Sequence, residues 1–217
     1  MCKMLVSLCV ALLVASASYG GIVGNWEGSS LDGWAGYGYG TSPCTLTPGQ
    51  TKGVTLDNGS LAVLIDTSAG GTYFSSSIAK TLSASDVALI NTGNAKFSVD
   101  VSLVASEWTG DNYLQPVGPK IYDGTTFWNL GPPEGGTFEW GWWQSDVTKT
   151  VVFDLTSPPA TFNPTNTQLI ITGMLQIYNN QPGTVGNIYF DNARITPEPA
   201  TMTLLGLGGL ALIRRKK

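Results

Sequence analysis

Apolar and polar side chains alternate in several short runs along the middle of the chain. From Phe97 to Leu103 every second residue is apolar, which predicts a strand with one buried face. The run from Val151 to Leu155 has the same period, and Leu169-Ile170-Ile171 is apolar on both faces, as in a central strand that is covered twice. Further strands are predicted at 61–65, 73–79, 169–178 and 188–195.

Turn-forming residues separate these runs. Asp57-Asn58-Gly59 predicts a hairpin between a strand at 54–56 and the strand at 61–65. One helical turn is expected at 85–90, capped by Ser83 or Ser85. Many short strands with little helix predict an all-β fold, an antiparallel β-sandwich of the jelly-roll type. The Gly- and Pro-rich segments 109–119 and 131–138 are candidate binding loops.

The first 17 residues have the layout of a secretory signal peptide. Lys3 is followed by an apolar stretch at 4–14 and by Ala15-Ser16-Ala17, a small-x-small cleavage pattern. We therefore expect a cleavable signal peptide at 1–17, export by the Sec machinery, and one folded domain at 18–196. A buried N-terminal helix is the alternative.

Removing both ends leaves an acidic domain. Residues 18–196 contain fourteen of the fifteen carboxylates but only six of the eleven basic residues, so the net charge is −4 for the whole chain and −8 for the domain. An acidic surface repels phosphate backbones, so no nucleic acid is expected as a partner. Cys44 is the one cysteine of this domain, which excludes an internal disulfide.

The sequence contains no histidine. This absence excludes Ser-His-Asp and Cys-His catalysis and zinc sites built on imidazole. Glycoside hydrolysis by a pair of carboxylates needs no histidine and is the alternative. The main candidates for its catalytic carboxylates are Glu107 and Glu139, because both adjoin a tryptophan. Because no glycosidase signature, nucleophile elbow or phosphate-binding loop surrounds them, we expect a protein that is not an enzyme.

Three segments resemble carbohydrate-binding modules of the galactose-binding-like jelly-roll type. They are Asn25-Trp-Glu-Gly-Ser-Ser-Leu-Asp-Gly-Trp34, Asn187-Ile-Tyr-Phe-Asp-Asn-Ala-Arg-Ile195, and Trp142-Trp143 leading into 149–155. Such modules often open with a Phe-Glu-x-Gly segment, where this chain has Trp26. The resemblance implies a polysaccharide partner and one structural Ca²⁺ with Glu27 and Asp191 as ligands, since calcium prefers hard oxygen donors. A solvated charge and a turn residue are the alternatives at these two positions.

The seven tryptophans divide into candidates for the core and candidates for a sugar platform. Trp26 and Trp34 are expected in the core or at its edge. In an extended strand Trp140 and Trp142 share one face, about 7 Å apart, and could stack on successive sugar rings. The expected sugar contacts, platform included, are Trp140, Trp142, Glu139, Gln144, Trp108, Tyr113 and Trp128. A tryptophan cluster that closes one end of the sandwich is the alternative, and a structural matrix protein fits the Gly-, Thr- and Asn-rich composition equally well.

The C-terminal segment 197–217 combines an acidic motif, an apolar run and a basic end. Pro197-Glu198-Pro199 precedes 14 residues, Ala200 to Ile213, which would span about 21 Å as a helix. This is shorter than the ~30 Å hydrocarbon core of a bilayer, so a short hydrophobic helix with a transient grip on the membrane is expected. The basic end, which would remain on the cytoplasmic side, consists of Arg214, Arg215, Lys216 and Lys217.

This order of residues resembles the PEP-CTERM sorting signal of Gram-negative bacteria. The resemblance implies processing of the tail by an exosortase during export, transient anchoring in the inner membrane, and a final place at the cell surface or in the exopolysaccharide matrix. An ordinary membrane anchor and a core helix are the alternatives.

Overall fold

The computed structural model describes residues 21–37, 44–55, 58–68, 73–109, 113–134, 141–142, 145–176 and 183–198. The expected signal peptide and the apolar C-terminal run lie outside these ranges. Within them, no helix has the length and apolar character needed to cross a bilayer.

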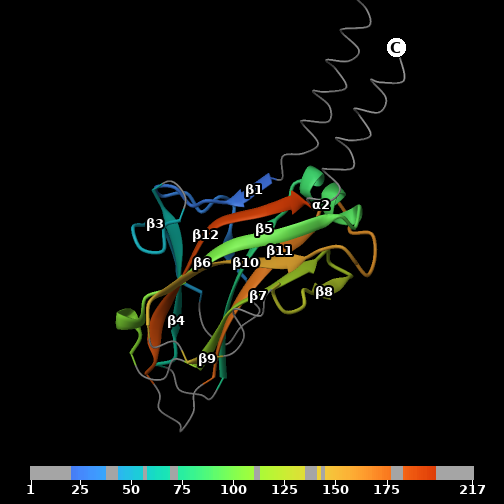
Figure 1. Ribbon diagram of the computed structural model, residues 1–217. Coiled ribbons are helices and arrows are strands. Elements are labelled where there is room, and N and C mark those ends of the chain that lie inside the picture. Colours follow the sequence, from blue (N-terminus) through green and yellow to red (C-terminus); the bar gives the residue numbers. More distant parts are fainter. Residues whose placement is uncertain are drawn as a thin grey trace, which may run out of the picture.

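Two six-stranded antiparallel sheets form a sandwich (Figure 1). The first sheet has the order β10-β6-β12-β4-β3, with β1 on β12, and the second has the order β2-β5-β11-β7-β8, with β9 on β7. The strands are β1 Gly21–Gly24, β2 Ala35–Gly36, β3 Leu46–Gln50, β4 Ser60–Asp66, β5 Tyr73–Thr81, β6 Ala95–Leu103, β7 Tyr113–Tyr122, β8 Phe127–Asn129, β9 Gly141–Trp142, β10 Val147–Asp154, β11 Gln168–Gln176 and β12 Val185–Pro197.

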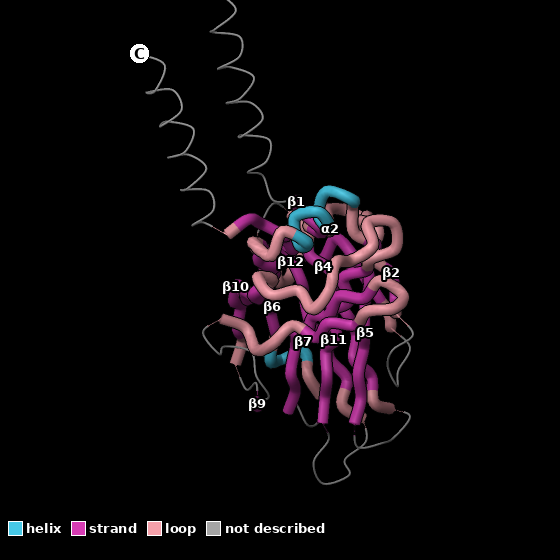
Figure 2. The backbone as a smooth tube through the Cα atoms, turned by 90° about the vertical axis from the view of Figure 1, so that its right-hand side faces the viewer, coloured by secondary structure: helices cyan, strands magenta, loops and turns pink. Residues whose placement is uncertain are grey.

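The long strands alternate between the two sheets along the chain. β4, β6, β10 and β12 belong to the first sheet, whereas β5, β7 and β11, which lie side by side in Figure 2, belong to the second. Because each strand sends every second side chain inward, two sheets built this way enclose one continuous core. The all-β sandwich predicted from the alternating pattern is confirmed.

The core draws on aliphatic and aromatic residues of both sheets. Phe97 of β6 and Phe153 of β10 are fully buried and stack with ring centroids 6.0 Å apart. Leu169, Ile170 and Ile171 are all buried in β11, which lies between β5 and β7, so the prediction of a central strand covered on both faces is confirmed. Burial of this apolar surface is the main stabilising contribution to the fold.

Tryptophans close one side of this core. Trp26 and Trp34 are 0% and 2% exposed, with ring centroids 5.8 Å apart, as expected for core residues. The Trp34 indole Nε1 donates to the Val23 carbonyl at 2.8 Å. Asp32 holds the loop between the two rings, since its Oδ2 accepts from the backbone N–H groups of Asn25 and Trp26 at 2.9 and 2.7 Å.

The hairpin expected around Asp57-Asn58-Gly59 is wrong, because Val54 and Thr55 are not in a strand. β4 pairs instead with β3, with Leu46 opposite Val63 and Gln50 opposite Ser60. The intervening segment 51–55 crosses the outer face of the first sheet. A Cβ on Gly53, whose φ is +67°, would lie 2.4 Å from the Cβ of Tyr189, so only glycine allows this close approach to β12.

One short helix covers an end of the sandwich. Helix α2, Ala84–Asn91, begins after Ser83, whose hydroxyl accepts from the Asp86 N–H, so the expected helix and cap are confirmed. Its last residue exchanges two hydrogen bonds with the backbone of Phe162. Helix α2 and strand β9 lie at opposite ends of the molecule (Figures 1 and 2).

Candidate functional site

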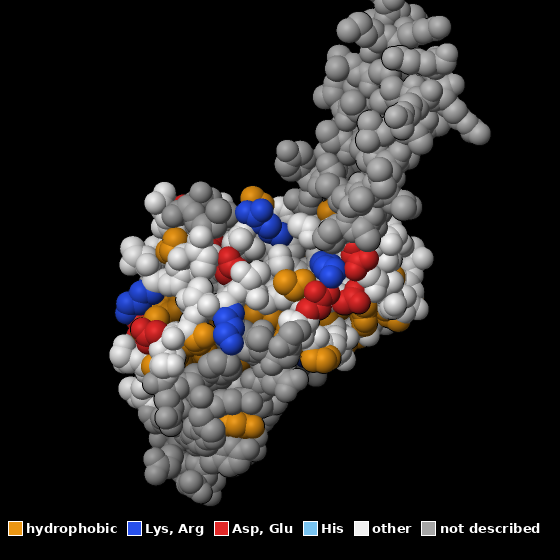
Figure 3. Space-filling model, in the orientation of Figure 1, with side chains coloured by type: hydrophobic (Ala, Val, Ile, Leu, Met, Phe, Trp, Pro, Cys, Tyr) orange, Lys and Arg blue, Asp and Glu red, His pale blue; other side chains and the backbone are white. Residues whose placement is uncertain are grey.

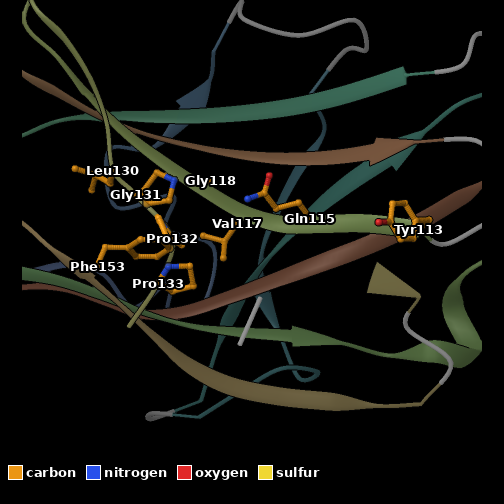
Figure 4. A pocket seen from close by; sticks show the side chains of 10 residues that line it. Tyr113, Gln115, Val117, Gly118, Leu130, Gly131, Pro132, Pro133 and Phe153 are labelled. Atoms are coloured by element: carbon orange, nitrogen blue, oxygen red, sulfur yellow. The ribbon is translucent and has the colours of Figure 1, made fainter. Parts of the chain in front are cut away.

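A cavity of about 550 Å³ lies along β7 (Figure 4). Leu130 to Pro133 and Phe153 lie toward one end of it, and Gln115 and Tyr113 toward the other. The described residues that line it are Tyr113, Gln115, Val117, Gly118, Pro119, Leu130, Gly131, Pro132, Pro133 and Phe153. Both candidate binding segments, 109–119 and 131–138, therefore contribute to it, although the first is a strand from Tyr113 onward and not a loop.

The cavity lies at a break in the edge of the second sheet. β8 pairs with Lys120 to Tyr122 of β7, and β9 pairs with Tyr113 and Leu114. Between these two short strands, no described strand pairs with 115–119 on that side. The chain that leaves β8 makes one described backbone hydrogen bond to β7, from Leu130 N to the Pro119 carbonyl at 3.1 Å. Pro116 and Pro119 have no N–H to donate, which suits them to a strand edge that is not extended by a neighbour.

The described lining of the cavity is uncharged and has two kinds of surface. Val117 and Phe153 are buried and give it an apolar floor. The Gln115 amide and the Tyr113 hydroxyl are its polar side-chain groups, and each can both donate and accept a hydrogen bond. An apolar wall with a few polar groups that fix orientation is the usual composition of a small-ligand site.

Two of the sequence-predicted residues meet at one end of this cavity. Tyr113 of β7 and Trp142 of β9 are register partners in the antiparallel pair, and Leu114 lies opposite Gly141. The side chain of Trp142 lies outside the described part of the structure, as do the predicted contacts Glu139, Trp140 and Gln144. Contacts with sugar at these four positions stay predictions.

Trp108 and Trp128 pack against the protein and do not line the cavity. A Cβ on Gly186 would lie 2.2 Å from Cδ2 of Trp108, so the indole rests directly on the backbone of β12. Trp128 stacks on Phe162 with ring centroids 6.0 Å apart and planes 17° apart. Both side chains are partly buried against the core, and sugar contacts at these two positions stay predictions.

Both expected calcium ligands accept a backbone hydrogen bond from the chain just before β4, Asp191 from Thr55 and Glu27 from Asn58. Asp191 is fully buried beneath 51–55 and accepts the Thr55 N–H at 2.7 Å, whereas Glu27 accepts the Asn58 N–H at 3.0 Å. The register partner of Asp191 is a second buried carboxylate, Asp100. In the described ranges no three acidic, His or Cys side chains gather as a metal-binding group. Calcium stays a prediction.

Asp100 is a residue that the sequence analysis did not single out. Its position on the polar face of an alternating strand was the available signal. Thr55 and Thr150 donate their hydroxyls to Asp100 at 2.5 Å each, and the Asn192 amide donates at 3.1 Å. These donors satisfy a carboxylate that lies opposite another carboxylate, an arrangement that is destabilising when it is left uncompensated.

Of the two carboxylates considered for hydrolysis, the structure describes Glu107, which is engaged in an ion pair. Glu107, in the short 3-10 helix Ala105–Glu107, binds Lys52 and accepts from the Tyr189 hydroxyl. Burial raises the pKa of that tyrosine. Glu134 accepts from Lys96 at 2.6 Å. Glu139 lies outside the described residues.

A hydrogen-bonded turn joins β7 to β8. The Asp123 carboxylate accepts from the backbone N–H of Thr126 at 2.7 Å and from the N–H and hydroxyl of Thr125. These bonds favour the ionised form and lower the pKa of Asp123 to about 2. On the same hairpin, desolvation lowers the pKa of Lys120, whose Nζ lies 5.6 Å from the ring centroid of Phe127.

In structure, the body of the chain resembles carbohydrate-binding modules. One is a family 28 module specific for non-crystalline cellulose, with 12% identity, a TM-score of 0.48, and coverage of 82% of this chain and 96% of that one. A mannan-recognising family 27 module, TmCBM27, has 10% identity, a TM-score of 0.46, and coverage of 81% and 95%. Enzymes also occur among the similar structures, such as the active domain of tailspike protein 4 from bacteriophage CBA120, with 11% identity, a TM-score of 0.42, and coverage of 81% and 21%.

The C-terminus carries a PEP-CTERM protein-sorting motif, matched at residues 196–217. The motif implies an exported cell-surface protein that is sorted by an exosortase. No curated protein sequence matches the chain.

Proposed function

We propose that this protein is a non-catalytic, polysaccharide-binding protein of the cell surface, and that its binding site is the cavity along β7. The observation that carries the proposal is the cavity of about 550 Å³, which is uncharged in its described lining and has Tyr113 and Gln115 toward one end, where β9 joins the sheet. This volume lies within the roughly 300–1,000 Å³ of small-ligand sites.

The chemistry of the lining suits a sugar ring. A pyranose offers an apolar C–H face, which an aromatic ring or an aliphatic floor can cover, and a rim of hydroxyls that both donate and accept. Val117 and Phe153 supply the floor, while Tyr113 and Gln115 supply the groups for hydroxyls. Trp142, the register partner of Tyr113, is the aromatic residue that we assign to stacking on the next sugar unit.

Affinity electrophoresis against soluble polysaccharides tests this assignment. We expect retardation by at least one polysaccharide, and weakening of about tenfold, near 1.4 kcal/mol, in Tyr113→Ala and in Trp142→Ala. Phe127→Ala is the matched control, because Phe127 is an aromatic residue of β8 that is 41% exposed and does not line the cavity.

The other candidate functions correspond to other outcomes. Retardation by no member of a broad panel would favour a structural matrix protein. Hydrolysis of a polysaccharide that is lost in Glu107→Gln would favour the glycosidase and would end the proposal of a non-catalytic role.

A further inference from the structure

The sorting motif begins inside the folded sheet. β12 continues to Pro197, with Thr196 opposite Lys96 of β6 and Pro197 opposite Ala95. The next residue, Glu198, donates its backbone N–H to the Asn94 carbonyl at 2.9 Å. Because the matched motif starts at Thr196, its first three residues are part of the body of the protein, two residues beyond the expected boundary at 196.

A lysine lies among the carboxylates at this end of the sheet. The Lys96 Nζ is 2.6 Å from Glu134 Oε1 and 3.7 Å from Glu198 Oε1, and Asp154 is the register partner of Lys96 on β10. The hydrogen bond to Glu134, with added attraction from Glu198 and Asp154, raises the pKa of Lys96. Figure 3 shows a basic side chain flanked by acidic side chains on this face.

The end of β12 depends on these contacts because Pro197 contributes little to the ladder. A proline has no N–H to donate, so the backbone bond of Glu198 and the attraction between Glu198 and Lys96 add to the pairing of Thr196 with Lys96 in holding this end against β6. Without the ammonium, Glu134, Asp154 and Glu198 would repel one another, and the end of the strand would separate more readily from β6.

We propose that Asn94 and Lys96 form a latch on the sorting motif, so that the folded domain and the exosortase compete for the same Pro197-Glu198 segment. An enzyme that reads this segment must engage the Glu198 carboxylate and backbone, which the latch already occupies. Processing of the folded protein therefore requires the end of β12 to leave β6 first. The inference rests on the matched motif and is independent of sugar binding.

The first test measures the latch itself, as the amide exchange rate of Glu198 in the full chain. Lys96→Gln should raise this rate about two- to fivefold, the range expected for an exposed ion pair. Glu134→Gln, which removes a competing and repelling carboxylate at the same lysine, should leave it unchanged or lower it. Glu198→Gln should match Lys96→Gln, and the double variant should exchange no faster than either single variant.

The second test measures the competition, as the rate at which the tail is lost in a Gram-negative host that carries an exosortase, followed by intact mass. Lys96→Gln should be processed faster and Glu134→Gln no faster than the wild type, while the melting temperature of both stays close to the wild-type value. Equal Glu198 exchange in wild type and Lys96→Gln would overturn the latch. Faster exchange with an unchanged rate of tail loss would overturn the competition.

Discussion

At the scale of single residues, sequence does not show which tryptophans pack against the rest of the protein. Four tryptophans pack against or within the core: Trp26, Trp34, Trp108 and Trp128. The indole N–H of Trp34 donates to the backbone carbonyl of Val23. The assignment of Trp26 and Trp34 to the core followed from general burial tendencies. Those tendencies could not show that Trp108 would lie on Gly186, since this contact joins positions far apart in the chain.

Asp123 supports a prediction on acid stability at this scale. Its pKa is depressed from 3.8 to about 2 in the folded state, so its stabilising contribution is fully present above about pH 4 and is lost as the pH falls toward 2. Urea unfolding of Asp123→Asn should therefore show lower stability than the wild type at pH 6, with a difference that shrinks as the pH approaches 2. A difference that stays constant from pH 6 to pH 2 would contradict the role assigned to the carboxylate.

At the scale of elements, local patterns predicted strands better than they predicted strand partners. Alternating runs predicted β6 and β10, because a half-buried strand has period two, and further apolar runs predicted β4, β5, β11 and β12 within a few residues. The strand predicted to pair with β4 was wrong. A turn signal at 57–59 cannot show that Gly53 packs on Tyr189 and that Thr55 bonds to Asp191 on the outer face of the first sheet. The cavity could not be predicted from the sequence for a related reason, since it depends on where β8 and β9 each pair with β7.

The contact between Trp108 and β12 gives a prediction for packing between elements. Gly186→Ala should lower the free energy of unfolding by about 1–3 kcal/mol, because the added Cβ would meet the Trp108 ring at 2.2 Å and force a shift. Gly131→Ala is the matched control, since its Cβ would have no atom within 4 Å. Equal stability of the two variants in urea unfolding would contradict the packing role of Trp108.

At the scale of the whole molecule, an acidic domain ends in a sorting motif that is partly folded into its sheet. Glu198 belongs to both parts, since it lies in the matched motif and bonds to Asn94. Sequence identified the motif, because its order of residues is local. The attachment to β6 required the register of β12, which no local pattern encodes.

Calcium is the prediction that concerns the stability of the whole domain. If Glu27 and Asp191 help to hold Ca²⁺, added calcium should raise the melting temperature and EDTA should lower it, because a ligand that binds only the native state stabilises it. Asp191→Asn should abolish the difference between the two melts. Identical transitions with and without EDTA would count against the metal and would leave Asp191 as a buried acceptor for Thr55.

The most direct test of the central claim is an NMR titration of the full-length protein with soluble oligosaccharides from the polysaccharide that retards it most. The proposed site predicts that the largest shift changes fall on backbone amides that line the cavity, at Gln115, Val117, Gly118 and Gly131. Amides on the outer face of the first sheet, such as Ser98 and Arg194, should not move. Shift changes confined to that face, or none with any member of the panel, would contradict sugar binding along β7.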